Sequence, residues 1–305
     1  GEHVHEVERI PRHGADCVGF RQKATAAVVL GDETAPTAAG EMMSAGNVGT
    51  DDMRAPGARV VVVTGANEGI GHHLLAALAE AGYRVAGFDV DGANVERLRG
   101  SHPDRVRFVE CDVTSDADVE AAVDGVLDEW DRIDILVNDA AVFNFAPFEE
   151  QTFDDTRREF EVNYFGYVRT IRAVLPHMRE RGDGIVHNVS SGAGLVGHPG
   201  LTGYASTKGA VEALVRSLRL ELRHEDVACT VMHPPLTNTR STAELGYPES
   251  LLRDPEAVGR NLAKKIESTE RTIFADWQTR VGLFLSRRFP YLVEKGTERF
   301  VSPPE

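Results

Sequence analysis

Long apolar runs are missing from this sequence of 305 residues, and no stretch of about 18 apolar residues is available to span a membrane. The chain opens with acidic residues at 1–6, where a secretory signal would be basic. The apolar run at 26–30 is too short for a signal core. These absences predict no membrane span and no firm membrane association, and they favour a cytoplasmic protein.

Cysteine and lysine are also scarce. The three cysteines, Cys17, Cys111 and Cys229, lie far apart, without a Cys-x-x-Cys pair or a histidine at ligand spacing. This spacing excludes a disulfide framework and favours inert thiols in a reducing compartment, and we expect no metal site. Only five of the 33 basic residues are lysines, and the net charge is −15. Because an acidic surface repels phosphate backbones, the composition also argues against a nucleic-acid partner.

From residue 59 onward the sequence alternates between strand-like and helical stretches. Short β-branched runs predict buried parallel strands at 59–64, 84–89, 106–110, 133–138, 184–189 and 227–232. Helices are expected near 70–81, 116–130, 153–181 and 204–223. This alternation predicts an α/β fold with a doubly wound parallel sheet, in a single domain at 56–305. Residues 1–55 follow neither period, and we expect a disordered leader there.

A glycine-rich turn links the first expected strand to the first expected helix. Its sequence at 64–71, Thr-Gly-Ala-Asn-Glu-Gly-Ile-Gly, allows a tight turn and a close approach of the backbone to a pyrophosphate at the helix N-terminus. A lone glycine cluster is weak evidence, but its place between strand and helix favours a dinucleotide site of the Rossmann type. The predicted cofactor contacts in this turn are Gly65, Asn67, Glu68, Gly69, Ile70 and Gly71.

Asp89 ends the second expected strand, 24 residues beyond Gly65. A carboxylate there accepts hydrogen bonds from both hydroxyls of an adenosine ribose and repels a 2′-phosphate. Glu68 adds a second negative charge where a site for NADP would profit from a basic residue. The alternative for Asp89 is an ordinary turn residue at a strand end. The sequence therefore predicts NAD rather than NADP.

Tyr204 and Lys208 stand four residues apart, on one face of an expected helix. Tyrosine has an ordinary pKa near 10, and a neighbouring ammonium, together with an oxidised nicotinamide, is expected to pull that pKa toward neutrality. Such a pair is common by chance, but three further residues accompany it. Ser191 lies 13 residues before Tyr204, just after a strand, Asn163 lies in the preceding long helix, and Asn138 ends the fourth strand.

Taken together, these residues resemble the short-chain dehydrogenase/reductase family in its single-domain, NAD-dependent form. The resemblance is close over 59–239 and loose over 240–305. It implies that Tyr204 is the acid–base and that Ser191 orients the reacting oxygen. It also implies that Lys208 binds the nicotinamide ribose and tunes Tyr204, while Asn163 anchors a water in a proton relay.

The same resemblance implies further cofactor contacts. Asp112, in Cys-Asp-Val at 111–113, matches the residue that contacts adenine, and Thr239 matches a threonine near the nicotinamide carboxamide. The full set that it adds is Asp112, Val113, Asn138, Ala140, Pro234 and Thr239, besides Tyr204 and Lys208.

Three departures from the family pattern stand out. Asn-Asp-Ala-Ala at 138–141 replaces the second asparagine and the closing glycine, and because alanine tolerates a positive φ poorly, we expect this turn to sit differently against the cofactor. Pro234-Pro235 replaces Pro-Gly, which stiffens the segment that leads to Thr239. His233 precedes this pair, and packing is a more economical interpretation than catalysis, since the proton-transfer role is already filled.

The substrate end of the sequence is mostly apolar. Residues 240–253 correspond to the family's substrate lid and carry several apolar side chains, which favours a small-molecule substrate with an apolar body. Phe143, Phe145, Leu195 and His198 are candidates either for the pocket wall or for ordinary packing. A C-terminal helical extension is expected at 254–305. Its amphipathic part at 277–293 suits packing on its own domain or on a partner subunit better than insertion into lipid.

The reaction that these patterns favour is the reversible oxidation of a secondary alcohol to a ketone, with hydride transfer to NAD. An epimerase or dehydratase of the same superfamily has a different glycine spacing, and a non-catalytic NAD-sensing regulator typically loses the tyrosine or the lysine. A methyltransferase would have no use for Ser191 beside Tyr204 and Lys208. By analogy with the family, we expect a homo-oligomer, a dimer or a tetramer, formed through the helices at 153–181 and 204–223.

Overall fold

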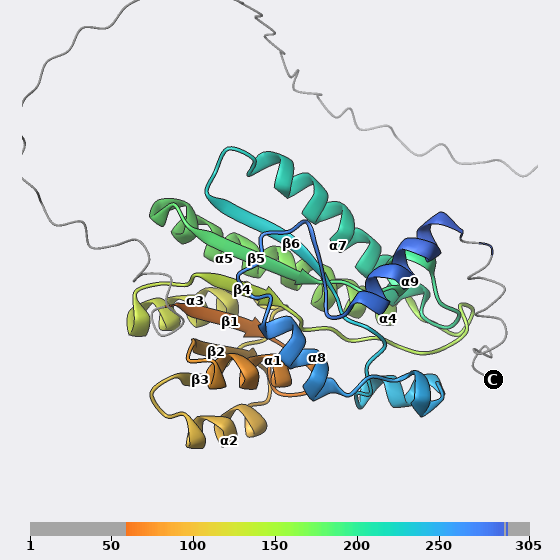
Figure 1. Ribbon diagram of the computed structural model, residues 1–305, viewed down its shortest axis with the longest axis horizontal. Coiled ribbons are helices and arrows are strands. Elements are labelled where there is room, and N and C mark those ends of the chain that lie inside the picture. The colour runs from red at the N-terminus through yellow and green to blue at the C-terminus, as the bar shows by residue number, and fades with distance from the viewer. Residues whose placement is uncertain (1–58, 290, 292–305) are drawn as a thin grey trace, which may run out of the picture. The chain divides into compact units, whose positions relative to one another are not determined.

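The structure of the protein, a computed structural model, describes residues 59–289 and 291. It contains a seven-stranded sheet with helices on both faces (Figure 1). The expected leader at 1–55 lies outside the described residues, as does most of the tail beyond residue 289. None of the helices in the described part is long and apolar enough to cross a membrane. The cytoplasmic location stays a prediction.

All strands of the sheet run parallel, in the order β3-β2-β1-β4-β5-β6-β7. Helices cover both faces, so the central strands are buried on both sides and consist largely of apolar, β-branched residues. The predicted doubly wound α/β fold is confirmed. The strands are β1 Val60–Thr64, β2 Arg84–Asp89, β3 Val106–Glu110, β4 Ile135–Asn138, β5 Gly184–Val189, β6 Val227–His233 and β7 Thr272–Phe274.

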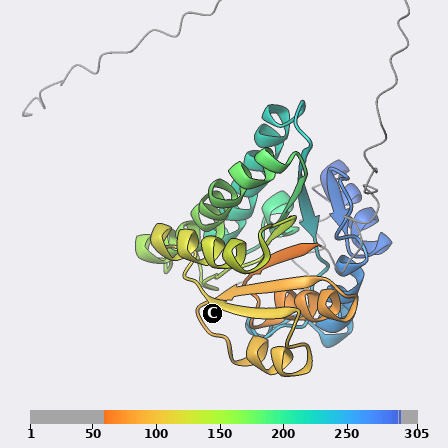
Figure 2. The ribbon, with the colours of Figure 1, turned by 90° about the vertical axis from the view of Figure 1, so that its left-hand side faces the viewer.

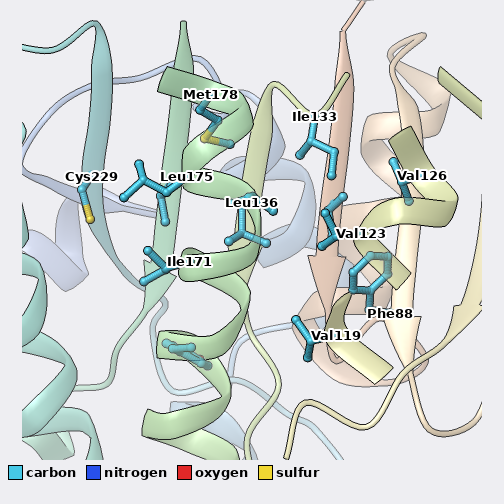
Figure 3. Close-up of a cluster of buried hydrophobic side chains, with 14 of the residues drawn as sticks. Phe88, Val119, Val123, Val126, Ile133, Leu136, Ile171, Leu175, Met178 and Cys229 are labelled. Carbon is cyan, nitrogen blue, oxygen red and sulfur yellow. The ribbon is translucent and has the colours of Figure 1, made fainter. Parts of the chain in front are cut away.

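Two separate hydrophobic cores lie on the two faces of the sheet. On one face, α3 (Asp116–Trp130), α5 (Gly166–Arg181) and α7 (Thr202–Glu221) pack against the strands (Figures 1 and 2). Figure 3 shows part of this core, where Phe88, Leu136 and Met178 meet side chains of α3 and α5. On the other face, α1 (Gly69–Glu80), α2 (Ala93–Ser101) and α8 (Pro255–Ala263) cover the sheet.

The long helix expected at 153–181 is in fact three consecutive helical segments. They are α4 (Phe153–Phe160), the π-helical turn η3 (Glu161–Phe165) and α5. Wider π-helical turns within α-helices occur mainly at functional sites. This one contains the predicted relay residue Asn163.

The C-terminal region corrects one expectation, because 254–305 is not a purely helical extension. β7 extends the sheet by pairing in parallel with β6, where Met232 lies beside Ile273. A three-residue strand is too short to show a strand period, and its burial depends entirely on its neighbour. After it comes α9 (Trp277–Arg288). The lid at 240–253 contains two short 3₁₀ helices, η4 (Ser241–Leu245) and η5 (Glu249–Leu251).

The order of the strands fixes where a ligand binds. The chain winds from β1 outward to β2 and β3, then returns past β1 to β4 and continues in the opposite direction. The loops that follow β1 and β4 therefore diverge at the carboxyl ends of these strands. In open α/β sheets this divergence leaves a crevice that serves as the binding site.

Candidate active site

A cavity of about 1230 Å³ lies at the carboxyl ends of the strands, at the crevice between the loops after β1 and β4. It brings together most of the residues that the sequence singled out, from Gly65 to Thr239. The predicted cofactor contacts on its wall are Gly65, Asn67, Glu68, Gly69, Ile70, Asp89, Asp112, Val113, Ala140, Pro234 and Thr239, and the predicted catalytic residues there are Ser191, Tyr204 and Lys208.

The glycine turn has the close backbone packing that a dinucleotide site needs. Gly65 has φ +69°, and a Cβ atom there would lie 2.7 Å from the Cα of Ala140. At Gly71 a Cβ would lie 2.3 Å from the carbonyl oxygen of Gly65. Glu68 precedes α1 without capping it through its side chain, so its carboxylate does not occupy the first N–H groups of the helix. These features fit the pyrophosphate of a dinucleotide.

Asp89 is held at the end of β2 by the turn itself. Its Oδ2 accepts a hydrogen bond of 2.9 Å from the backbone N–H of Asn67, and its Oδ1 accepts one of 3.3 Å from the N–H of Asp91. A carboxylate oxygen has room for a second donor, so both oxygens remain available to ribose hydroxyls. Glu68 also lines the cavity wall. Its Oε1 atom lies 3.4 Å from Nη1 of Arg240, so these two side chains form an ion pair. The ion pair offsets part of the negative charge of Glu68.

Asn138 and Asn163 lie behind the cavity wall, with their side chains fully buried. Asn138 donates to the side chain of Asn188 and accepts from Thr170. It therefore joins β4 to β5 and α5, and its implied contact with the cofactor stays a prediction. Asn163 exchanges two hydrogen bonds of 2.8 Å with the backbone of Val142. Its side chain thus anchors the loop after β4 to the π-helical turn.

Ser191 and Tyr204 bring two hydroxyl groups together at the cavity. Ser191 follows β5, and Tyr204 lies in the first turn of α7, where the two side chains form a hydrogen bond. The ring of Phe143 packs edge-on against that of Tyr204, with 5.6 Å between the ring centroids. The Nζ atom of Lys208, one helical turn further along α7, lies 5.6 Å from the Tyr204 ring centroid.

The surroundings that the protein itself gives Tyr204 do not lower its pKa, and the expected fall in the presence of an oxidised nicotinamide stays a prediction. Burial raises the pKa of Tyr204 to about 12, nearby carboxylates add to the rise, and the hydrogen bond with Ser191 opposes it. Burial also lowers the pKa of Lys208 to about 8. The ammonium points toward the hydroxyl of Tyr167 and the carbonyl oxygen of Val189, rather than toward the Tyr204 hydroxyl. Lys208 alone therefore does not bring the Tyr204 pKa to neutrality.

Asp139, one of the departures from the family pattern, adds a carboxylate to the floor of the site. It accepts a hydrogen bond from the backbone N–H of Gly71, and desolvation raises its pKa to about 6 although nearby Lys208 opposes the rise.

The turn at 138–141 does not need the left-handed backbone that the family's glycine would allow. Asp131 is the only non-glycine residue with a positive φ within 59–289 and 291. Ala140 and Ala141 thus close the turn without left-handed backbone.

We expect Asp139→Asn to stabilise the protein more at alkaline pH than at acidic pH. The folded-state pKa of Asp139 is raised above its unfolded value of 3.8, so ionisation disfavours the folded state, and this cost develops between pH 3.8 and about pH 6 and persists above it. Because the carboxyl group is only partly shielded from solvent, we expect a gain of about 1 kcal/mol, or a Tm about 2 to 4 °C higher, at pH 8. The gain in Tm is measured by thermal unfolding of the variant and the parent at pH 8 and at pH 4.5. The exposed Asp128→Asn serves as the control, and an equal gain at both pH values would contradict the assignment.

The end of the cavity that is expected to hold the substrate is lined by residues of the predicted lid at 240–253 and of α9. Leu245, Tyr247 and Leu251 of the lid line it, and the Tyr247 hydroxyl lies 2.5 Å from Nε2 of His198. Of the four candidates for the pocket wall, Phe143 and His198 line the cavity, whereas Phe145 packs against His198. The wall also includes residues on or just before α9 that the sequence did not indicate as pocket residues: Asp276, Gln278, Thr279, Gly282 and Leu283.

His233 is packed in the interior, as expected. It is 2% exposed, its ring stacks on that of Phe274, and its Nε2 lies 2.8 Å from Oε1 of Glu212. The pair joins the end of β6 to α7, behind the cavity. This histidine therefore supports the framework of the site.

Comparisons with known proteins agree with this site. The family model for short chain dehydrogenases matches residues 59–249. The 2-(R)-hydroxypropyl-CoM dehydrogenase of Xanthobacter autotrophicus is 34% identical over 64% of this chain and 81% of its own. The 3-alpha-(or 20-beta)-hydroxysteroid dehydrogenase of Mycobacterium bovis is 31% identical over 71% of this chain and 81% of its own.

A solved structure shares both the fold and the cofactor class. The 3-ketoacyl-(acyl-carrier-protein) reductase from Brucella melitensis, complexed with NADH, has a TM-score of 0.67 at 26% identity. The similarity covers 72% of this chain and 97% of that one. The chain belongs to the short-chain dehydrogenase family, and it is an oxidoreductase that acts on an alcohol group with a nicotinamide cofactor.

Proposed function

We propose that this protein oxidises a secondary alcohol with an apolar body to the ketone, with NAD as its cofactor. The observation that carries the proposal is the pair of hydrogen-bonded hydroxyls of Ser191 and Tyr204 on the cavity wall, with the ammonium of Lys208 one helical turn away. This arrangement holds an alcohol oxygen beside a group that takes its proton. An epimerase, a dehydratase or a non-catalytic NAD sensor remains the alternative if no alcohol is turned over.

The chain's own residues perform the proton chemistry. Ser191 donates a hydrogen bond to the reacting oxygen, and the phenolate of Tyr204 removes the hydroxyl proton. A bound oxidised nicotinamide would supply the acceptor for the hydride and a positive charge that favours the ionised form of Tyr204. Burial lowers the pKa of Lys208 to about 8, and its amine lies one helical turn from Tyr204, on the proposed path of the proton. The side chain of Asn163 is already bonded to Val142, so its part is to hold the loop that borders the site.

Asp89 supports NAD as the cofactor. Its two oxygens are fixed by the N–H groups of Asn67 and Asp91, at the edge of the cavity where β2 ends. A carboxylate held there accepts the ribose hydroxyls, whereas a 2′-phosphate would meet its charge. Arg240, which also lines the cavity, pairs with the carboxylate of Glu68.

The lining of the cavity supports an apolar substrate. Leu245, Tyr247 and Leu251 from the lid, Phe143 from the loop after β4, and Leu283 from α9 surround the space beyond Tyr204. A wall of this kind binds a hydrocarbon body and excludes water during hydride transfer. One relative is named as a hydroxysteroid dehydrogenase, which has such a substrate.

Leu283 provides a test of the substrate wall. We expect Leu283→Ala to raise KM for an apolar secondary alcohol about 5-fold while kcat changes less than about 2-fold, because an apolar contact with the bound substrate is lost. Leu285→Ala on the same helix is the matched control, since Leu285 is 46% exposed and points away from the cavity. Equal effects of the two substitutions would show that α9 acts only through stability.

Self-association through the helices beside the site is also proposed. Phe153 at the start of α4, Phe165 in the π-helical turn and Leu220 near the end of α7 are exposed by 84%, 43% and 68%. Large exposed apolar side chains on neighbouring helices suit an interface between subunits. This supports the homo-oligomer expected from the family.

The function is tested by following NADH absorbance while a panel of secondary alcohols is offered with NAD, and the corresponding ketones with NADH. We expect turnover of cyclic and long-chain apolar alcohols and a lower KM for NAD than for NADP. Complete inactivity toward the whole panel, with NADH binding intact, would favour the epimerase or the sensor. Tighter binding of NADP would overturn the role given to Asp89.

A further inference from the structure

Tyr167 is a buried phenol close to the reacting groups, and the proposed proton chemistry does not use it. It lies in the first turn of α5, is 1% exposed, and faces α7 across the interior. Its hydroxyl donates to the carbonyl oxygen of Val189 at 3.2 Å and accepts from Nζ of Lys208 at 3.1 Å. The phenol thus connects three elements, α5, β5 and α7, at a single hydroxyl group.

The surroundings of Lys208 show why this contact matters. The ammonium has three protons to donate, and it gives one to Tyr167 and one to the Val189 carbonyl at 2.9 Å. The third remains for the cavity, which Lys208 lines. Nζ also lies 5.0 Å from the ring centroid of Tyr167 and 5.6 Å from that of Tyr204, so the cation is held between two aromatic rings.

The π-helical turn and the start of α5 place Tyr167 on the same side as Asn163, facing α7. Asn163 and Tyr167 are four residues apart and face the same neighbour, α7. Asn163 donates to the hydroxyl of Thr207 at 3.1 Å, and Tyr167 accepts from the adjacent Lys208. The two contacts fix consecutive residues of α7 against the π-helical turn and α5.

We propose that Tyr167 is a positioning residue that holds the ammonium of Lys208 in place between Tyr204 and the cavity. This inference rests on the proposed function, since it assigns to Lys208 the task of favouring the Tyr204 phenolate and of donating to the cofactor ribose. A lysine side chain has four rotatable bonds to order, and two fixed acceptors keep its third proton directed at the cavity. Without the phenol, the Val189 carbonyl is the remaining fixed acceptor among these contacts.

The charges around Lys208 give the direction of the expected effect. Asp139, from the loop after β4, favours the charged amine, whereas burial disfavours it. Desolvation keeps the pKa of Tyr167 well above its ordinary value, so the phenol remains neutral and acts through its hydrogen bonds. Tyr204 faces Lys208 from the same helix, and Glu159 from α4 adds negative charge beside Tyr204. Loss of an acceptor from the ammonium disfavours the charged amine, and with it the Tyr204 phenolate.

Tyr167→Phe tests this inference, because it keeps the ring and removes only the hydroxyl. We expect the acid limb of the kcat/KM profile for alcohol oxidation to move up by about one pH unit, with about a 10-fold loss at pH 7. We also expect NADH, measured by its fluorescence, to bind several-fold more weakly. Tyr167→Phe removes two hydrogen bonds, a loss smaller than the stability of a typical domain, so the variant is expected to fold, which thermal unfolding verifies.

Tyr83→Phe is the matched control. Tyr83 is also a buried phenol, 7% exposed, and its hydroxyl bonds to Glu267 at 3.0 Å, away from the cavity wall. A Tyr167→Phe substitution that lowers Tm as much as Tyr83→Phe does, and yet leaves the acid limb and the NADH affinity unchanged, would overturn the proposal. If Tyr167→Phe does not fold, Tyr167→His, which keeps a ring nitrogen as acceptor, is expected to hold the limb within about half a pH unit of the parent. A shift of a full unit in that variant would overturn it.

The same measurements separate this inference from the proposed function. If the parent protein oxidises no alcohol in the panel, the proposed function fails while NADH binding still reports on Lys208. An unchanged NADH affinity in Tyr167→Phe then overturns the positioning role independently. If the parent oxidises an alcohol and Tyr167→Phe has the same pH profile and NADH affinity as the parent, the proposed function stands and the positioning role of Tyr167 fails.

Discussion

Tyr204→Phe is expected to lower kcat/KM for alcohol oxidation by about 10³-fold, the range typical of losing a positioned acid–base group. The substitution removes one oxygen and keeps the ring. The packing against Phe143 and the proximity of Lys208, both at 5.6 Å, are therefore retained. The affinity for NADH should change less than about 2-fold, because the lost group acts on the substrate proton.

Tyr247→Phe is the control for this prediction. Tyr247 is a second phenol on the cavity wall, where it bonds to His198 in the lid region, so it matches Tyr204 in chemistry and in exposure to substrate. We expect it to retain activity within a few-fold of the parent. Steady-state rates by NADH absorbance measure both variants. A Tyr204→Phe enzyme that kept a tenth or more of its activity would remove Tyr204 from the proton-transfer role.

Asp89→Asn is expected to lower the ratio of kcat/KM for NAD over NADP by about 100-fold. The amide keeps an oxygen to accept from the Asn67 N–H, so the turn is preserved while the charge that repels a 2′-phosphate disappears. The affinity for NAD should fall as well, since a neutral oxygen binds ribose hydroxyls less strongly than a carboxylate does.

Asp91→Asn separates a local effect from a general one. It removes the same charge two residues away, also on the cavity wall. We expect the cofactor ratio to change less than about 3-fold there, because an exposed charge further from the ribose is screened by solvent. Initial rates with both cofactors at several concentrations measure the ratio. Equal changes in the two variants would mean that net charge at the rim, rather than Asp89, selects the cofactor.

Much of the fold was predictable because local patterns and tertiary structure agree. β1 is a run of valines that only a strand buried on both faces accommodates, and all six strands expected from such runs are present, in parallel. The α2 helix was not predicted, because Val95 is its only buried residue and its amphipathic pattern is correspondingly weak. β7 was not predicted, because its three residues become a strand only through pairing with β6.

The candidate site divides in the same way. Some site residues were predictable because each follows or ends a strand, or lies in a recognisable helix pattern: Gly65, Asp89, Ser191 and Tyr204. Since the strands are parallel, their carboxyl ends lie at one edge of the sheet, and these residues meet at one cavity there. No local pattern connects Tyr167 with Lys208. That contact depends on how the π-helical turn and α5 face α7 across the interior.

The sequence by itself determined the fold class and the glycine turn, and it supplied the prediction of the reacting groups, because each depends on short-range spacing and residue chemistry. The tertiary structure alone decided where the Lys208 ammonium points, that burial raises rather than lowers the pKa of Tyr204, and that α9 closes the substrate wall. The physical reason is that desolvation and hydrogen-bond partners are set by atoms far away in the chain. Spacing along one helix places two side chains on the same face but does not specify what surrounds them.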